Sequence, residues 1–161
     1  MATDTFSPIS LSVELVPQPT DTTCWAASMA MVVGTRDRQS VTAATIAQAA
    51  GMTITDGYGW GDIQKAVGQW NLNQLGPACA LPSAWAEMLQ AHGPIWIVEI
   101  GAPYHAVVVT GVEGDGTPEG TTILVNNPWP PNSGAQERKA YTDFENEFEL
   151  GAGAGAQMVS A

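Results

Sequence analysis

The hydrophobic pattern of the chain is strongest in one uninterrupted stretch near the N-terminus. Every residue from Cys24 to Val33 is apolar or small, and the alanines in this run favour a helix over a strand. Asp21, Thr22 and Thr23 come directly before it, and each is suited to cap a helix N-terminus. Gly34 follows it and is a typical helix stop signal. The pattern therefore predicts a buried helix over residues 24–33.

Three further segments have the features of helices. Thr42–Ala50 ends at Gly51, and Ser83–His92 ends at Gly93. Gly61–Trp70 places its apolar side chains at helical spacing. The first half of the chain is therefore predicted to be mainly helical.

After Gly93 the pattern changes to runs of β-branched residues. Such runs occupy Ile95–Ile100, Ala106–Val112 and Thr121–Val125, which predicts three strands. The intervening Glu113–Gly120 segment is rich in glycine and is expected to be a hairpin loop. Helices followed by strands indicate an α+β fold.

The two ends of the chain are less regular. Residues 1–16 predict an extended lead-in that stops before a proline. Tyr141–Leu150 is expected to be a short acidic helix, and Gln157–Ala161 a last strand. Between them, the low-complexity Gly151–Ala156 segment is expected to be a flexible loop. The length of 161 residues predicts that residues 1–161 form a single domain.

The composition excludes several classes of protein. Charged residues make up 13% of the chain, against roughly 25% in an average protein. The net charge of −11 repels phosphate, so we expect no direct nucleic-acid binding. Two cysteines are too few for a disulfide scaffold or a four-cysteine zinc site. The sequence also has no P-loop, no GxGxxG motif and no metal-ligand spacing, so we expect no metal and no cofactor.

The sequence also bears on localisation. No apolar run reaches the roughly 18–20 residues that a membrane span needs, so we expect no membrane partner. Residues 1–10 lack the basic and apolar regions of a Sec signal peptide. We therefore expect either a cytoplasmic protein or one that is exported by another route.

Cys24 is the first candidate for chemistry because it lies in the first turn of the predicted helix. The unpaired amide groups and the helix dipole at that end favour a thiolate, which also needs a base or an imidazolium beside it. Of the two histidines, His92 ends a helix, where a cation is ordinary. His105 opens an apolar strand in which a polar ring has no packing reason. We therefore predict that His105 is the partner of Cys24.

Asn127 follows the next predicted strand and is expected to orient the ring of His105. Asn126 is a rival for this role, because strand alternation lets only one of the two face the histidine. Both asparagines also suit a simple turn before Pro128. Trp129 is expected to cover the hydrogen bond between the histidine and the asparagine.

Gln18 lies six residues before Cys24, and its side-chain amide is suited to donate a hydrogen bond to an oxyanion. Two plainer interpretations of Cys24 stay open. One is an inert buried thiol, which is a common fate of a cysteine. The other is a disulfide with Cys79.

These residues follow one another in an order that resembles the papain superfamily of cysteine peptidases: Gln18, Cys24 followed by Trp25, His105, and Asn127-Pro128-Trp129. The short interval between the cysteine and the histidine is similar to that of the compact bacterial members. These are the effector proteases of plant pathogens and the peptidases that cleave double-glycine leaders. There are two departures: Pro19 stands where papains often have glycine, and Asn127 stands where many compact relatives have aspartate.

The resemblance implies a papain-like fold with an N-terminal helical part that carries the cysteine and a C-terminal antiparallel sheet that carries the histidine and the asparagine. It also implies four roles. Cys24 is the nucleophile, His105 is the base and then the acid, Asn127 orients the histidine, and Gln18 donates to the oxyanion.

Three tryptophans are expected to bind the substrate. Trp25 and Trp129 are neighbours of the catalytic positions in the sequence. Trp60 lies in a segment rich in glycine and aromatic residues, where its ring is suited to line a cleft.

The activity that the resemblance implies is cleavage of a protein or peptide substrate through a thioacyl-enzyme, with preference for small residues such as glycine at the cleavage site. It further implies a bacterial effector or toxin that leaves without a Sec signal, acts in the cytoplasm of a target cell and has a cognate inhibitor protein. The same triad also serves deamidases, transglutaminases and peptidoglycan amidases. A non-enzymatic interaction domain on the same scaffold is a third interpretation.

Overall fold

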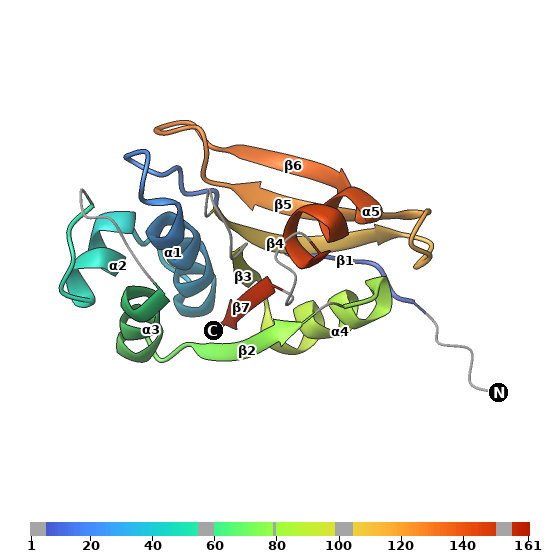
Figure 1. Cartoon of the computed structure of the whole chain (residues 1–161), viewed down its shortest axis with the longest axis horizontal. Helices are drawn as coiled ribbons and strands as arrows, with labels where there is room; N and C mark the ends of the chain where they lie inside the picture. Colours follow the sequence, from blue (N-terminus) through green and yellow to red (C-terminus); the bar gives the residue numbers. More distant parts are fainter. Residues whose placement is uncertain (1–5, 55–59, 79, 99–104, 151–155) are drawn as a thin grey trace.

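The computed structural model describes residues 6–54, 60–78, 80–98, 105–150 and 156–161. It is an α+β fold in which helices come first and an antiparallel sheet dominates the second half of the chain, as expected. Figure 1 shows the first three helices grouped at one end of the molecule, with the long strands of the sheet running away from them.

The N-terminal helices lie close to where the sequence predicts them. Helix α1 spans Cys24–Asp37, α2 spans Ala43–Ala49 and α3 spans Trp60–Gln69. All ten residues from Cys24 to Val33 are buried, which confirms the predicted buried helix.

The predicted end of α1 at Gly34 is wrong. The helix continues to Asp37 and ends at Arg38, whose left-handed backbone conformation (φ 55°) directs its N–H to the carbonyl of Gly34. A Cβ on Gly34 would lie 2.7 Å from the carbonyl oxygen of Gln39. The glycine therefore allows a close approach of the chain after the helix and does not terminate it.

Among the described residues, one sheet contains all the strands, and every strand pairing in it is antiparallel. The order is β2-β7-β3-β4-β5-β6, and the short β1 pairs with β4. The strands are β1 (Ile9–Ser10), β2 (Asn73–Ala78), β3 (Ile95–Val98), β4 (Ala106–Gly114), β5 (Thr121–Asn127), β6 (Ala135–Ala140) and β7 (Ala156–Ser160).

The predicted runs at residues 95–100, 106–112 and 121–125 correspond to β3, β4 and β5, and the predicted last strand corresponds to β7. Residues 99 and 100 lie outside the described part. The short strand β1 lies within the expected extended lead-in. Strands β2 and β6 were not predicted, because neither has an apolar run: β2 reads NQLGPA and β6 reads AQERKA.

Two hydrophobic cores lie on opposite faces of the central strands. Trp96, Val98 and Val108 pack with helix α1, whereas their neighbours Ile97 and Val109 pack in the other core. The second core also holds residues of α4 (Pro82–His92), of α5 (Tyr141–Phe144) and of the π-helical turn η1 (Glu145–Leu150). Because β3 and β4 are covered on both faces, they are apolar at nearly every position and lack alternation.

The short acidic helix expected over residues 141–150 is present as α5 and η1 together. Among the described residues, none of the helices is both long enough and apolar enough to cross a membrane.

Candidate active site

Cys24 is the first residue of α1, and it is 3% exposed. The residue before it, Thr23, occupies the N-cap position but makes no capping hydrogen bond with its side chain. Its hydroxyl instead accepts from the N–H of Thr20 at 3.1 Å, and it lies 3.0 Å from the hydroxyl of Thr20. The partial positive charge at a helix N-terminus favours an anion beside the first turn.

Two hydrogen bonds fix the start of α1 against the sheet. The hydroxyl of Ser28, one turn after Cys24, donates to the carbonyl of Ala106 at 3.1 Å. The indole N–H of Trp96 on β3 donates to the carbonyl of Trp25 at 3.1 Å. All four residues are buried, so the first turn of the helix is held opposite the beginning of β4.

His105 comes immediately before β4, and it lies between the two other members of the predicted triad. Its Nε2 is 2.8 Å from Oδ1 of Asn127, and its ring forms a hydrogen bond with the thiol of Cys24. The structure therefore brings together three residues that are separated by 81 and 22 positions in the sequence.

The surroundings of His105 act on its pKa in opposite directions. Burial lowers the pKa, because it penalises the imidazolium. The hydrogen bonds with Cys24 and Asn127 raise it, and so do the negative charges of Cys24 and Glu147. The raising effects outweigh burial, and the pKa of His105 lies above its ordinary value. This environment favours an imidazolium beside the thiol.

Strand alternation decides between the two asparagines. The side chain of Asn126 donates to the carbonyl of Val13 at 3.2 Å, on one face of β5. Asn127 points to the other face, toward His105. Its Oδ1 also accepts from the main-chain N–H of Trp129 at 2.9 Å. The expectation that Asn127 is the one that contacts the histidine agrees with this geometry.

Gln18 is almost fully buried, and its main chain is held by the loop that follows β5. Its N–H donates to the carbonyl of Pro128 at 3.0 Å, and its carbonyl accepts from Asn132 at 2.9 Å. Its side-chain Nε2 donates to the carbonyl of Thr20 at 2.7 Å. This bond uses one of the two amide hydrogens and leaves the second for another acceptor.

The family model described as papain-like cysteine protease AvrRpt2 matches residues 6–149. The chain belongs to this family. The comparison with curated proteins found no match.

Two solved structures share the papain-like fold of this protease. One is a double-glycine-motif protease from an AMS/PCAT transporter, in complex with the leader peptide. It has 22% sequence identity, the match covers 94% of each chain, and the TM-score is 0.61. The other is the peptidase domain of Streptococcus ComA, a bifunctional ABC transporter involved in quorum sensing. It has 17% identity, the match covers 91% of this chain and 97% of that one, and the TM-score is 0.59.

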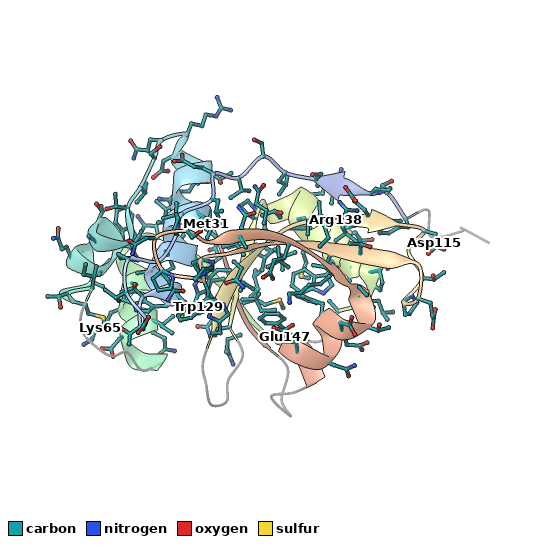
Figure 2. All side chains as sticks on the ribbon, turned by 90° about the horizontal axis from the view of Figure 1, so that it is seen from above. Met31, Lys65, Asp115, Trp129, Arg138 and Glu147 are labelled. Atoms are coloured by element: carbon teal, nitrogen blue, oxygen red, sulfur yellow. The ribbon has the colours of Figure 1, made fainter. Side chains whose placement is uncertain are left out.

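The predicted substrate-binding tryptophans of this papain-like protease differ in their exposure. Trp25 is fully buried in the core beneath α1, so the expectation that its side chain contacts a substrate is wrong. Trp129 is 47% exposed and therefore accessible from solvent (Figure 2). The side chain of Trp60 lies outside the described part of the structure, and so does Cys79. The alternative disulfide therefore stays untested.

Sequence reasoning missed two residues that support the site. Ser28 was detectable, because it is a polar residue within an apolar run, four positions after Cys24. Glu137 accepts a hydrogen bond from Nδ2 of Asn127 at 3.1 Å. It had no such signal, because it lies among other polar residues in a strand that was not predicted.

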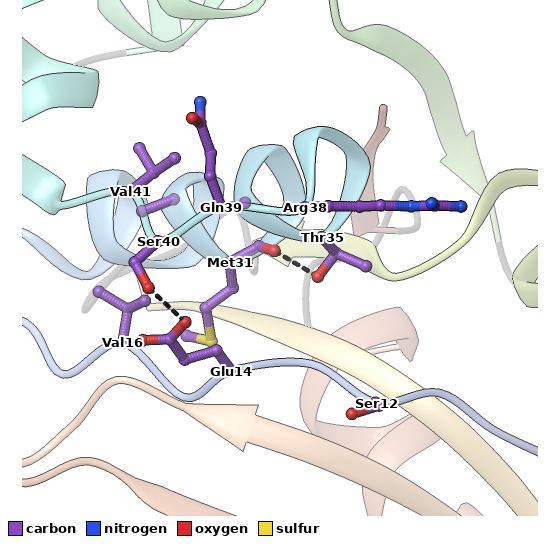
Figure 3. Close-up of a pocket in the computed structure, with 11 residues that line it drawn as sticks. Ser12, Glu14, Val16, Met31, Thr35, Arg38, Gln39, Ser40 and Val41 are labelled. Carbon is purple, nitrogen blue, oxygen red and sulfur yellow. Dashed lines mark hydrogen bonds between the residues drawn. The ribbon is translucent and has the colours of Figure 1, made fainter.

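Two of the cavities that the described residues form have a volume of about 380 Å³ each, and neither is lined by Cys24, His105 or Asn127. Figure 3 shows one of them, which lies against the C-terminal half of α1, where Ser40 donates to Glu14 at 2.8 Å. The other lies on the face of β5 that carries Asn126. Within the described ranges, no group of three or more histidine, cysteine or acidic residues is arranged to hold a metal ion.

Proposed function

We propose that this member of the family is a cysteine endopeptidase whose catalytic triad is Cys24, His105 and Asn127. The observation that carries the proposal is the position of the histidine ring, which forms a hydrogen bond with the thiol and lies 2.8 Å from the asparagine oxygen. Because Nε2 faces Asn127, Nδ1 is the ring nitrogen left to exchange a proton with the thiol.

The reaction follows from this pairing. The thiolate of Cys24 attacks the carbonyl carbon of a peptide bond, and the carbonyl oxygen becomes an oxyanion. The imidazolium of His105 gives its proton to the leaving amine as the C–N bond breaks, which yields a thioacyl-enzyme. Neutral His105 then takes a proton from water, and the resulting hydroxide attacks the thioester. This step releases the acid, expels the Cys24 thiolate and leaves His105 protonated, which restores the thiolate–imidazolium pair.

We propose that two donors hold the oxyanion: the main-chain N–H of Cys24 and the second amide hydrogen of Gln18. The orientation of the Gln18 amide supports its role, since Nε2 is fixed by the carbonyl of Thr20. Replacement of one oxyanion donor typically costs about 10²–10³ in rate. Gln18→Ala is expected to lower kcat by that factor.

The direct test is replacement of the nucleophile. Cys24→Ala is expected to abolish peptide hydrolysis, whereas the control Cys79→Ser retains it, as measured with a fluorogenic peptide mixture. Iodoacetamide followed by peptide mapping should show that Cys24 is alkylated faster than Cys79 at pH 6. Wild-type activity in the Cys24→Ala variant would exclude the proposed mechanism. Deamidation instead of cleavage would add about one dalton to a substrate protein without producing fragments.

The pH dependence has a defined direction. Burial lowers the pKa of His105, but its hydrogen bonds and nearby negative charges raise it further, to above the ordinary value of about 6.5. The imidazolium therefore persists above that pH, and kcat/KM should fall only as the pH rises through the raised value. Asn127→Ala removes one of these hydrogen bonds and is expected to move the alkaline limb to lower pH. An unchanged alkaline limb would contradict the role of Asn127.

We also propose a peptide substrate with small residues, such as glycine, at the cleavage site. The proposal is supported by the fold that the chain shares with a protease bound to its leader peptide. A peptide library with varied residues before the cleaved bond tests it, because cleavage mainly after bulky residues would overturn this preference.

We further propose that the enzyme is a bacterial effector that is exported without a Sec signal, acts in the cytoplasm of a target cell and has a cognate inhibitor protein. Membership of the family supports this context. A reporter fused to the chain should appear in the target cell only when the producing cell is present with its secretion machinery. Retention of the reporter in the producer would favour a cytoplasmic enzyme.

A further inference from the structure

The side-chain amide of Asn127 must present one particular end to His105. An amide has nearly the same shape when its oxygen and nitrogen are exchanged, so packing alone does not select the orientation. In the structure Oδ1 receives two contacts, from Nε2 of His105 at 2.8 Å and from the N–H of Trp129 at 2.9 Å. The opposite orientation would direct the NH₂ group at both of these partners and would deprive the histidine of its acceptor.

Glu137 contacts the other end of this amide. Its Oε1 accepts from Nδ2 of Asn127 at 3.1 Å. The register of β5 and β6 explains the contact: Asn127 lies opposite Ala135 and Val125 lies opposite Glu137, so the two side chains are diagonal neighbours on one face. An ionised carboxylate only accepts hydrogen bonds, and an amide oxygen turned toward it would be repelled.

The charge of Glu137 is balanced within the sheet. Oε2 of Glu137 lies 3.4 Å from the ammonium of Lys139, which also donates to Glu147 at 3.0 Å. The lysine side chain is 23% exposed, so the cluster is partly screened from water. Burial lowers the pKa of Lys139, but the two carboxylates outweigh it and the pKa is raised. The lysine therefore stays charged between two acids.

We propose that Glu137 is a positioning residue of the active site that holds the Asn127 amide with its oxygen toward His105. This inference rests on the proposed triad. In this arrangement the negative charge of Glu137 orients the amide of Asn127 directly and acts on His105 only through that amide. The titratable groups around His105 are the thiol of Cys24 on α1 and Glu147 on η1, and Lys139 separates the latter from Glu137.

The first test compares two substitutions at one position. Glu137→Ala removes the acceptor and is expected to lower kcat about 10- to 100-fold, with KM almost unchanged. Glu137→Gln keeps a carbonyl acceptor and should recover part of that loss. Glu113→Ala is the matched control: it removes a carboxylate of similar exposure from the same sheet, in an ion pair with Arg138, and should leave kcat unchanged.

A second test uses the reactivity of the thiol, which needs no substrate. The alkylation rate of Cys24 by iodoacetamide, measured from pH 5 to 9 with peptide mapping, reports on the pairing with His105. Glu137→Ala should lower this rate below pH 7 and move the profile toward that of an ordinary thiol with a pKa of about 8.5. Thermal unfolding of each variant shows that the fold is retained.

The decisive test is a double substitution. Asn127→Asp alone places two carboxylates face to face and is expected to lower kcat and thiol reactivity. Adding Glu137→Gln removes this repulsion and should restore part of kcat and part of the thiol reactivity. A wild-type alkylation profile and kcat in Glu137→Ala, or no recovery in the double variant, would overturn the inference. If wild-type protein cleaves no peptide, the proposed protease function fails, while the alkylation profiles still decide the role of Glu137.

Discussion

Helix α1 and strand β6 both support the same site, but they do so with opposite chemistry. Residues 25–33 of α1 are all buried and uncharged, and they hold Cys24 by packing and two buried hydrogen bonds. Strand β6 alternates between half-buried and exposed residues and is mostly polar. Through its charged Glu137, it contacts Asn127 at the edge of the sheet.

Because of this difference, the part of the site on α1 and the part on β6 should respond to different perturbations. Packing in a close-packed core is sensitive to the volume of a side chain and indifferent to salt. Charged contacts at a partly exposed edge tolerate changes of volume but respond to pH and ionic strength. Cys24, the proposed nucleophile, is therefore held by shape, whereas the proposed orientation of His105 depends on charge.

The largest effect on stability is expected from a substitution in the packed core of α1. Trp25→Ala opens a cavity beneath Cys24 and should lower the free energy of unfolding by about 3–5 kcal/mol in urea titrations. Trp129→Ala is the matched control, because this indole is 47% exposed and its replacement should cost less than about 0.5 kcal/mol. Equal losses from the two substitutions would contradict the assignment of Trp25 to the core.

A smaller effect is expected from the buried hydrogen bond between α1 and β4. Ser28→Ala leaves the carbonyl of Ala106 without this donor and should cost about 1–3 kcal/mol. It should also lower kcat, because the bond joins Ala106, which directly follows His105, to Ser28, which lies one turn after Cys24. Ser40→Ala, which removes an exposed hydroxyl from Glu14, should leave both quantities nearly unchanged. Unaltered kcat in Ser28→Ala would show that packing alone aligns the two elements.

The smallest effect is expected at the exposed ion pair of β6. Arg138→Met breaks the contact with Glu113 and should change the free energy of unfolding by less than about 1 kcal/mol. That difference should shrink further in 1 M salt, because ions screen exposed charges. A salt-independent loss larger than this would show that the strand is held by packing, as α1 is.

Sequence reasoning succeeded where one physical signal dominates. The apolar runs of α1 and β4 predicted both elements, because burial on every side leaves no place for polar residues. Strand alternation alone did not choose between Asn126 and Asn127. The order Asn127-Pro128-Trp129, which resembles the papain superfamily, favoured the asparagine that contacts His105.

The rest depended on contacts between distant segments. The sequence of β6 has neither an apolar run nor a strong β-propensity, so its place beside β5 follows only from the completed sheet. Glu137 was missed for the same reason, since its relation to Asn127 exists only through strand register. Gly34 was misinterpreted because a stop signal and a close approach require the same residue.

Strand β7 lies between β2 and β3, although it is the last element to be synthesised of those in the sheet. When β3 emerges from the ribosome, its neighbour on one side is still nearly sixty residues away, which corresponds to about 3–12 s of translation. Throughout that interval a fully apolar strand, IWIV, has an open edge, and β2 has no partner at all. The nascent chain is therefore most prone to aggregation just before its sheet closes. Chaperone occupancy should peak at that stage of synthesis.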